Sequence, residues 1–140
     1  MPIALTKVAY TTSATARGAR QGHVKSADGV IDLDLAQPGT SDEPRANPET
    51  LFAAGYSACF QGALANRAKT KGVDTSDSTV TAEVSFGPSE DGGFGLAVEL
   101  KVSIPGVDAE QARELVELAH EFCPYSKATR DNINVTLTVV

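Results

Sequence analysis

The longest helical pattern in the chain runs from Asn47 to Lys71, and its apolar residues occupy most of the helix circumference. Such a pattern is typical of a helix that is buried on several sides rather than amphipathic at the surface. Asn47 suits the N-cap, Pro48 suits the first helical position, and Gly72 follows the last turn as a terminating glycine. The pattern therefore predicts a long central helix within the core.

Three short strands are predicted before this helix. The first ends near Arg17, the second covers His23–Ser26, and the third covers residues 31–35, where apolar and acidic side chains alternate. Asp28-Gly29, between the last two strands, is typical of a hairpin turn. The polar, turn-rich segment 37–46 then predicts a surface loop that leads to the helix.

A long hairpin and a second helix are predicted after the central helix. Apolar and polar residues alternate over Val80–Phe86 and again over Phe94–Ile104, with a turn-rich segment between them. Asp108, with Gln111 three residues later, resembles a capping box. The apolar residues that follow recur at helical spacing, so we expect a helix that ends at about Phe122.

The C-terminal segment predicts a short third helix and a closing strand. Pro124 cannot continue the preceding helix without cost but suits the start of a new one, which we expect to run to Arg130. The alternating residues 133–139 then predict a last strand. The resulting order, βββ–α–ββ–αα–β, is that of an α+β fold. A chain of 140 residues can bury one sizeable core, so we expect a single domain over residues 1–140.

Composition narrows the classes of function. The chain has 12 basic and 18 acidic residues, a formal net charge of -6, and its lysines and arginines form no run. This balance argues against a nucleic-acid-binding surface and against a polybasic membrane anchor. The N-terminal segment lacks the apolar stretch of a secretory signal, and no apolar run reaches membrane-spanning length. We therefore expect a cytoplasmic protein.

Cys59 and Cys123 are the only obvious nucleophiles, although two cysteines in a reducing compartment are more often small buried hydrophobic residues. A helix start would favour the thiolate of Cys123, whereas burial would disfavour the thiolate of Cys59 in the middle of the long helix. Cys59 therefore needs a nearby cation to react. The spacing alone leaves open whether the two cysteines meet. His120 shares a helical spacing with Cys123, but His23 and Cys59 lie in other elements, so we expect no metal site.

Two segments around these cysteines resemble a known protein family. Residues 47–60, which include LFAAGYSACF, and residues 123–130, CPYSKATR, are similar to the two signature cysteine segments of the organic hydroperoxide resistance (Ohr) proteins, within the OsmC-like superfamily. The similarity extends over nearly the whole chain, through residues 10–22, 26–32, 94–105 and 132–140. Only the loop over residues 37–45 looks unlike the family.

The resemblance implies a cytoplasmic, homodimeric, cysteine-based peroxidase with the OsmC-like fold, which reduces organic hydroperoxides to alcohols. It implies no bound cofactor and no metal, and it implies an external reductant, dihydrolipoamide or a lipoylated protein. The peroxidatic cysteine of the family falls on Cys59, its resolving cysteine on Cys123 and its helix-start glutamate on Glu49. Its arginine falls on Arg20, which makes Arg17 a neighbour rather than the counterpart.

These residues suggest a mechanism. Arg20 would stabilise the Cys59 thiolate and the alkoxide leaving group, and Glu49 would hold the guanidinium through a bidentate contact. Reaction with the peroxide would leave a sulfenic acid on Cys59, which Cys123 would convert into a disulfide that a dithiol reduces. We expect an apolar substrate pocket lined by five aromatic residues, Phe52, Tyr56, Phe60, Phe122 and Tyr125.

Helix geometry separates two of the catalytic candidates. Glu49 and Cys59 are ten residues apart, which on one straight helix places them about 15 Å apart along the axis and about 80° apart around it. Either the helix breaks near Gly55, or Glu49 and Arg20 act on Cys59 of the other subunit. We expect the second arrangement, with the active sites at the interface of a two-fold homodimer.

Two other classes of function remain open at this point. A redox-sensing or ligand-binding module could use the same disulfide as a switch without turnover. An inert structural domain would contain two thiols that do not react with peroxides. Turnover of an organic hydroperoxide with a lipoyl dithiol distinguishes the enzyme from both.

Overall fold

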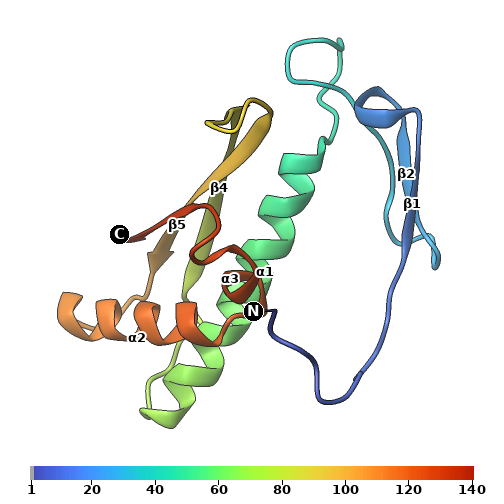
Figure 1. Ribbon diagram of the computed structural model, residues 1–140. Coiled ribbons are helices and arrows are strands. Elements are labelled where there is room, and N and C mark those ends of the chain that lie inside the picture. Colours follow the sequence, from blue (N-terminus) through green and yellow to red (C-terminus); the bar gives the residue numbers. More distant parts are fainter. Residues whose placement is uncertain (1) are drawn as a thin grey trace. The chain divides into compact units, whose positions relative to one another are not determined.

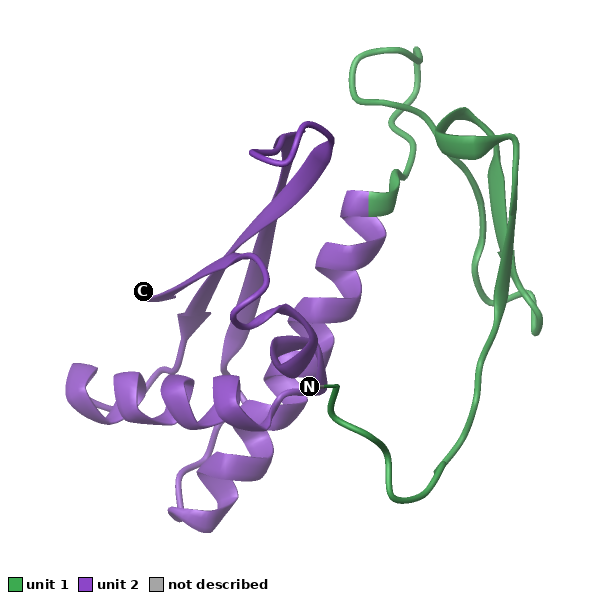
Figure 2. Cartoon of the chain, viewed as in Figure 1, with its two compact units in different colours: residues 1–48 green, residues 49–140 purple. Residues whose placement is uncertain are grey.

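The computed structural model describes residues 2–140 and contains the predicted elements in the predicted order, so the α+β fold is confirmed (Figure 1). The chain divides into two compact units, of which one ends at Pro48 and the other begins at Glu49 (Figure 2). The single domain expected from the sequence stays a prediction. The elements are β1 (Ala14–Arg17), a 3-10 turn (Ala19–Gln21), β2 (His23–Ser26), β3 (Asp32–Asp34), α1 (Pro48–Thr70), β4 (Thr79–Pro88), β5 (Phe94–Ser103), α2 (Ala109–Phe122), α3 (Pro124–Thr129) and β6 (Asn134–Val139).

The N-terminal unit is built on a three-stranded antiparallel sheet in the order β1-β2-β3. The β2–β3 turn contains Asp28 and Gly29, and Gly29 has a φ of 78°, a conformation that favours glycine. Side chains also connect the same pair of strands, because the His23 ring contacts Asp32 at 2.5 Å and Asp34 at 2.7 Å. The hairpin predicted from Asp28-Gly29 is therefore confirmed.

The C-terminal unit contains a second sheet, in the order β4-β5-β6. β4 and β5 form the predicted antiparallel hairpin, whereas β6 pairs parallel to β5. A parallel pair needs a crossover connection, and here α2 and α3 provide it. This crossover brings the segment around Cys123 to α1. Cys123 packs there in the same hydrophobic core as Tyr56 and Phe60 of that helix.

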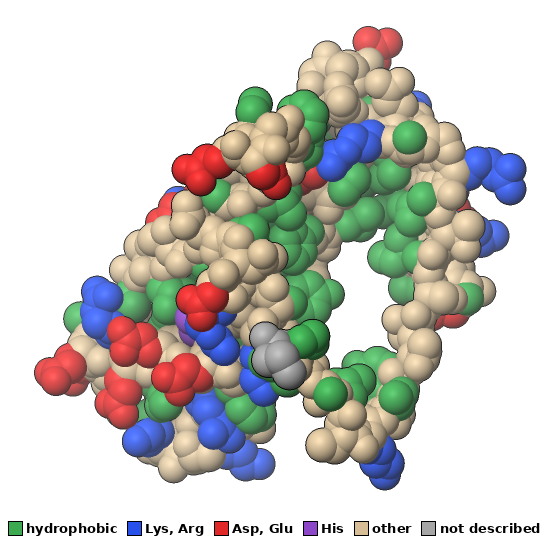
Figure 3. Space-filling model, in the orientation of Figure 1, with side chains coloured by type: hydrophobic (Ala, Val, Ile, Leu, Met, Phe, Trp, Pro, Cys, Tyr) green, Lys and Arg blue, Asp and Glu red, His purple; other side chains and the backbone are tan. Residues whose placement is uncertain are grey.

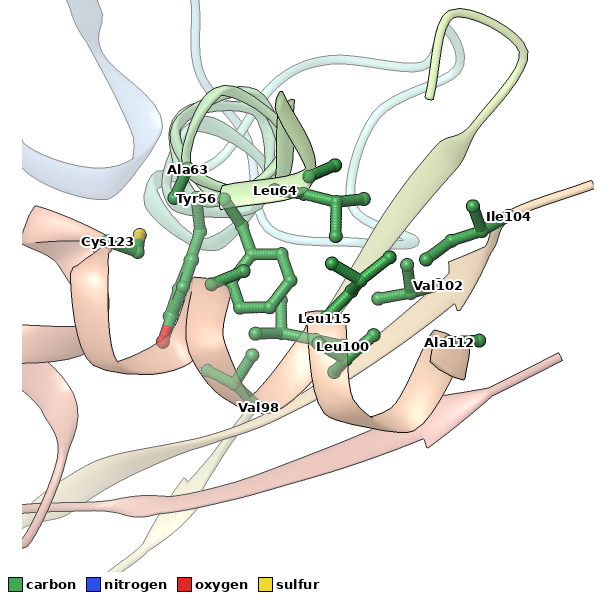
Figure 4. Packing of buried hydrophobic residues seen from close by; sticks show 14 residues of the cluster. Tyr56, Ala63, Leu64, Val98, Leu100, Val102, Ile104, Ala112, Leu115 and Cys123 are labelled. Atoms are coloured by element: carbon green, nitrogen blue, oxygen red, sulfur yellow. The ribbon is translucent and has the colours of Figure 1, made fainter. Parts of the chain in front are cut away.

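One face of α1 forms the centre of that core. Tyr56, Phe60 and Leu64, which are four residues apart, are completely buried there together with residues of β5 and α2 (Figure 4). The remaining fully buried side chains of the cluster are Ala68, Leu100, Val102, Leu115, Val116, Ala119 and Cys123. In Figure 4, Tyr56 and Cys123 lie at one end of the view and Ile104 at the other. Cys123 therefore lies toward one end of the core in this view.

Local sequence signals set the limits of α1. Pro48 occupies its first position, and Glu49 lies in its first turn, where the helix dipole favours an anion. At the other end Gly72 has a φ of 69°, its N–H donates to Lys69 O at 3.2 Å, and the N–H of Val73 donates to Ala68 O at 3.0 Å. These two bonds make a Schellman motif. The helix is continuous through Gly55.

The helix α2 is amphipathic. Its N-cap is Asp108, whose carboxylate accepts from the N–H of Gln111 at 2.8 Å, as the capping pattern predicted. Leu115 and Val116 are buried, whereas charged side chains of both signs gather over its outer face (Figure 3). Over residues 2–140, no helix combines the length and the apolar character that crossing a bilayer requires.

Candidate active site

The two cysteines meet in the C-terminal unit although 64 residues separate them in sequence. Cys59 lies in the middle of α1 and Cys123 lies between α2 and α3. Both are free thiols, and their Sγ atoms are 3.6 Å apart. Cys123 is completely buried and Cys59 is half-buried. The question that sequence spacing left open is settled, because the sulfurs are close enough to react with each other after a small movement.

The break between α2 and α3 places the sulfur of Cys123. Its backbone has φ −65° and ψ 125°, so it leaves the helical conformation, as expected for a residue that precedes proline. Its N–H still donates to Ala119 O at 2.8 Å, and its carbonyl accepts from the N–H of Lys127 at 2.9 Å. Cys123 thus caps both helices, and its backbone is fixed on either side.

Burial makes the thiolate of Cys59 less stable. The pKa of the Cys59 thiol is raised above its usual value, first by desolvation and further by the adjacent Cys123. The backbone N–H of Tyr125 hydrogen-bonds to the sulfur and opposes this rise. Because Pro124 has no N–H, Tyr125 supplies the first donor of α3. The net rise in the pKa of the thiol agrees with the prediction that Cys59 needs a nearby cation to react.

Three of the five predicted pocket residues form one aromatic cluster beside the cysteines. Ring centroids are 5.8 Å apart for Phe52 and Tyr56, 6.2 Å for Phe52 and Tyr125, and 5.7 Å for Tyr56 and Tyr125. Tyr125 is 38% exposed, whereas Tyr56 is completely buried. Phe52 and Tyr125 are therefore the members of the cluster that solvent reaches.

The other two predicted pocket residues lie elsewhere. Phe60 is completely buried in the core. Phe122 is 41% exposed, and the guanidinium carbon of Arg67 lies 4.3 Å from the centre of its ring. The structure thus does not bring all five aromatic side chains to one surface, and their role in binding a substrate stays a prediction.

A polar chain of three buried hydroxyls and the partly buried His120, which sequence reasoning missed, includes residues one helical turn from each cysteine. The hydroxyl oxygen of Tyr56 is 2.8 Å from that of Ser126 and 3.0 Å from that of Thr129. The Ser126 hydroxyl is also 2.8 Å from Nδ1 of His120. The only sequence signal was spacing, since Tyr56 precedes Cys59 by three residues and Ser126 follows Cys123 by three. We call His120, Ser126, Tyr56 and Thr129 the polar chain.

The environment of His120 disfavours the charged form of its ring. Its pKa is lowered from the usual value, first by burial and then by the charge of Arg130, while Glu121 and Asp131 oppose this effect. Arg130 also donates from Nη1 to the carbonyl of His120 at 2.8 Å. This contact joins the end of α2 to the end of α3.

Arg20 lies in a tightly built loop of the N-terminal unit. Gly18 and Ala19 have φ values of 81° and 59°, in the left-handed region, and Arg20 follows in the 3-10 turn. A Cβ added at Gly22 would lie 1.8 Å from Arg17 O, so only glycine fits there. The backbone that presents Arg20 is therefore defined by two glycines.

Arg20 and Glu49 are assigned to different units, and Glu49 begins the unit that contains both cysteines. The predicted contacts among Arg20, Glu49 and Cys59 stay predictions. The continuity of α1 removes one of the two explanations offered from the sequence, because the helix does not break near Gly55. Within the described residues, no three His, Cys, Asp or Glu side chains are grouped as a metal ion would require.

The chain is similar to known proteins over most of its length. The family model described as OsmC-like protein matches residues 39–138. The chain is 50% identical to the organic hydroperoxide resistance protein OhrB of Bacillus subtilis over 131 residues, which are 91% of this chain and 96% of that protein. It is 45% identical to the organic hydroperoxide resistance protein of Xanthomonas axonopodis pv. citri over 137 residues, 95% of this chain and 96% of that protein.

Solved structures agree with the sequence comparison. The crystal structure of OhrB from Bacillus subtilis superimposes with a TM-score of 0.90 and 48% identity, covering 95% of this chain and all of the other. A crystal structure of an organic hydroperoxide resistance protein from Elizabethkingia anophelis gives a TM-score of 0.88 at 53% identity, covering 96% and 98% of the two chains. The same fold therefore holds over nearly the whole length of these chains.

Proposed function

Since this chain belongs to the OsmC-like family and is about half identical to organic hydroperoxide resistance proteins, we propose that it is a thiol peroxidase that reduces organic hydroperoxides to alcohols. The names of these relatives support a role in resistance to organic hydroperoxides and in the response to oxidative stress. The single observation that carries the proposal is the 3.6 Å separation of the two thiol sulfurs.

In the first step, Cys59 reacts with the peroxide. Its thiolate attacks the distal oxygen, the O–O bond breaks, and the sulfur is oxidised to a sulfenic acid while an alkoxide leaves and takes up a proton as the alcohol. The sulfur is half-buried and so accessible to a substrate, but burial raises its pKa. Arg20 supplies the compensating cation, and Glu49 orients it through a bidentate contact.

In the second step, Cys123 attacks the sulfenic acid. A disulfide forms, and the hydroxyl of the sulfenic acid leaves with the thiol proton as water. The sulfurs close from 3.6 Å to the bonded distance of about 2.05 Å. Because Cys123 is completely buried, it reacts with its neighbour rather than with a bulky peroxide, which supports its role as the resolving residue.

In the third step, an external dithiol reduces the disulfide by thiol exchange. The half-buried sulfur of Cys59 is the accessible one of the pair, so the mixed disulfide forms there. A lipoyl dithiol, as dihydrolipoamide or on a lipoylated protein, suits this step because it resolves its own mixed disulfide. The enzyme then works in the cytoplasm without a bound cofactor.

The aromatic cluster supports an apolar substrate. Phe52 and Tyr125 are partly exposed beside the cysteine site and offer ring faces to an alkyl or fatty-acid hydroperoxide. Hydrogen peroxide has no apolar part to bury there. We therefore expect bulky organic hydroperoxides to be the better substrates.

The proposed functional form is a homodimer with active sites at the subunit interface. On α1 the small residues Ala54, Ala58 and Ala65 are exposed, which allows close approach of a second helix. On the continuous helix, Glu49 and Cys59 are too far apart to meet. A partner subunit that contributes Arg20 and Glu49 would complete the site.

Turnover tests the proposal. The purified protein should consume cumene hydroperoxide continuously with dihydrolipoamide as reductant, and the Cys59→Ser variant should consume none. The second candidate, a redox sensor, has the same close pair of thiols in its favour. A single oxidation per chain, without further turnover in the presence of dihydrolipoamide, would assign the protein to that class.

A further inference from the structure

We propose that the polar chain of His120, Ser126, Tyr56 and Thr129 positions the resolving thiol, so that removal of its hydroxyls slows disulfide formation without slowing the reaction with peroxide. This inference rests on the proposed function, because it concerns the second chemical step. The four side chains contact one another, and they act on the thiols through the helices that hold the cysteines.

The contacts of the polar chain connect the two helices one turn away from the sulfurs. Tyr56 lies one turn before Cys59 on α1, and Ser126 lies one turn after Cys123 on α3. The 2.8 Å contact between their hydroxyls therefore joins the same two helices that carry the thiols. It fixes the approach of α3 to α1 at a point close to the 3.6 Å contact between the sulfurs.

One further contact holds Ser126, and another holds the histidine that makes it. His120, near the end of α2, contacts the Ser126 hydroxyl through Nδ1 at 2.8 Å, and Arg130 at the end of α3 donates to the carbonyl of His120 at 2.8 Å. The break at Cys123 is thus bridged by side chains on both sides. This bridge keeps the angle between α2 and α3, and with it the direction of the Cys123 side chain.

Burial gives these hydrogen bonds their effect. Tyr56 and Ser126 are completely buried, and Thr129 is 5% exposed. Water does not readily replace a lost partner there, so removing one hydroxyl weakens the contact between the helices. In the described part of the chain every buried side-chain nitrogen and oxygen has a partner. The polar chain is therefore complete as it stands, and Ser126 and Tyr56 each make two of its contacts.

The step that the polar chain assists is the condensation of the Cys59 sulfenic acid with Cys123. The S–S bond forms as the S–O bond breaks, the sulfenic sulfur is reduced, the thiol sulfur is oxidised, and water is released. Its rate depends on how often the two sulfurs reach attack distance. If the two helices shift by about an ångström, the two sulfurs reach attack distance less often. Peroxide would still reach Cys59 as before.

The main test is a single-turnover experiment on Ser126→Ala with one equivalent of cumene hydroperoxide. Peroxide consumption should remain within about twofold of the parent rate. Loss of the second thiol should slow by about five- to tenfold, which corresponds to one lost hydrogen bond. A dimedone-type probe should trap more sulfenic acid in the variant than in the parent protein.

Three matched variants sharpen the test. Tyr56→Phe should slow loss of the second thiol as Ser126→Ala does. Thr129→Val should slow this loss less, because Tyr56 keeps its contact with Ser126. Ser78→Ala, which removes another buried hydroxyl of the same unit, should behave as the parent.

A double variant separates positioning from general loosening of the fold. In a Cys123→Ser background, Ser126→Ala should not change the lifetime of the sulfenic acid, because the thiol that it positions is gone. The inference is overturned if Ser126→Ala forms the disulfide at the parent rate, or if it alters the sulfenic acid equally in both backgrounds. Failure of the parent protein to consume peroxide would instead refute the proposed function.

Discussion

A Cβ added at Gly55 would lie 2.9 Å from the hydroxyl oxygen of Tyr125 and 3.2 Å from its ring. The ring of Tyr125 therefore packs on α1 at a position that has no side chain, and this allows its contacts with Phe52 and Tyr56. Glycine usually weakens the interior of a helix, so this close approach explains why α1 contains one there.

Gly55→Ala should stabilise the protein less than Gly62→Ala. No described atom lies within 4 Å of a Cβ added at Gly62, so alanine there should add up to about 1 kcal/mol to the free energy of unfolding through helix propensity. At Gly55 the displaced ring of Tyr125 offsets this gain. Urea denaturation of both variants measures the difference. In a Tyr125→Ala background the two substitutions should become equal, and a difference that persists there would contradict this explanation.

Replacing each of the two cysteines should affect a different step of the reaction with peroxide. Cys59→Ser should abolish the reaction with peroxide, because the accessible thiol is lost. Cys123→Ser should consume one equivalent and stop at a sulfenic acid that a dimedone-type probe labels. Mass spectrometry after labelling counts the adducts. Equal labelling of the two variants would contradict the roles assigned to the two cysteines.

Arg20→Ala should raise the pKa of the Cys59 thiol and slow its reaction with peroxide. An adjacent opposite charge shifts a pKa by about 1–3 units, so the rate at pH 7 should fall by about tenfold or more. Arg17→Ala is the matched control and should change the rate little. Arg20→Lys should recover only part of the loss, since lysine keeps the charge but not the bidentate contact. The opposite ranking of the two alanine variants would assign the role to Arg17.

Mixed dimers should reveal whether two subunits share one active site. A Cys59→Ser chain alone should be inactive and an Arg20→Ala chain alone should be slow, but a shared site in the mixed dimer would contain an intact Cys59 and an intact Arg20. Differently tagged chains allow its purification, and the expected result is about half of the parent activity per dimer, because one of the two sites is complete. A mixed dimer no more active than the Arg20→Ala protein would place all catalytic residues within one chain.

The two histidines should titrate on opposite sides of the usual value. The pKa of His120 is lowered by burial and by Arg130, whereas hydrogen bonds to Asp34 and Asp32 raise the pKa of His23. Proton NMR should therefore show the ring of His120 titrating below pH 6.5 and the ring of His23 above it. The Asp34→Asn variant serves as control and should lower only the pKa of His23.

The same shifts give opposite effects on stability. His120 binds its proton less well when folded, so its contribution is present above pH 6.5 and is lost as the pH falls through its lowered pKa. His23 binds its proton better when folded, so its contribution is present below pH 6.5 and is lost as the pH rises through its raised pKa. Unfolding of His120→Gln should show less destabilisation between pH 6.5 and pH 5 than the parent. An unchanged slope would show that His120 does not titrate as described.

The amino-acid sequence by itself determined the order and limits of the elements. Asp108 caps α2, Pro124 starts α3 and Gly72 ends α1 as expected, because caps, prolines and terminal glycines act on the backbone within a few residues. The strands followed from alternation, since a half-buried strand shows its period in any window of a few residues. The cysteine segments could be recognised for the same reason, because each one is short and contiguous.

Only the tertiary structure decided which distant residues meet. Cys59 and Cys123 come together because α2 and α3 cross from β5 to a parallel β6, and no local pattern specifies that pairing. The contact between Tyr56 and Ser126 likewise spans 70 residues and depends on how α3 packs on α1. The sequence suggested that Cys59 would be desolvated, but the extent of its burial, and the N–H of Tyr125 that opposes the rise in its pKa, arise from that packing. Reactivity at this site is therefore a property of the packed helices.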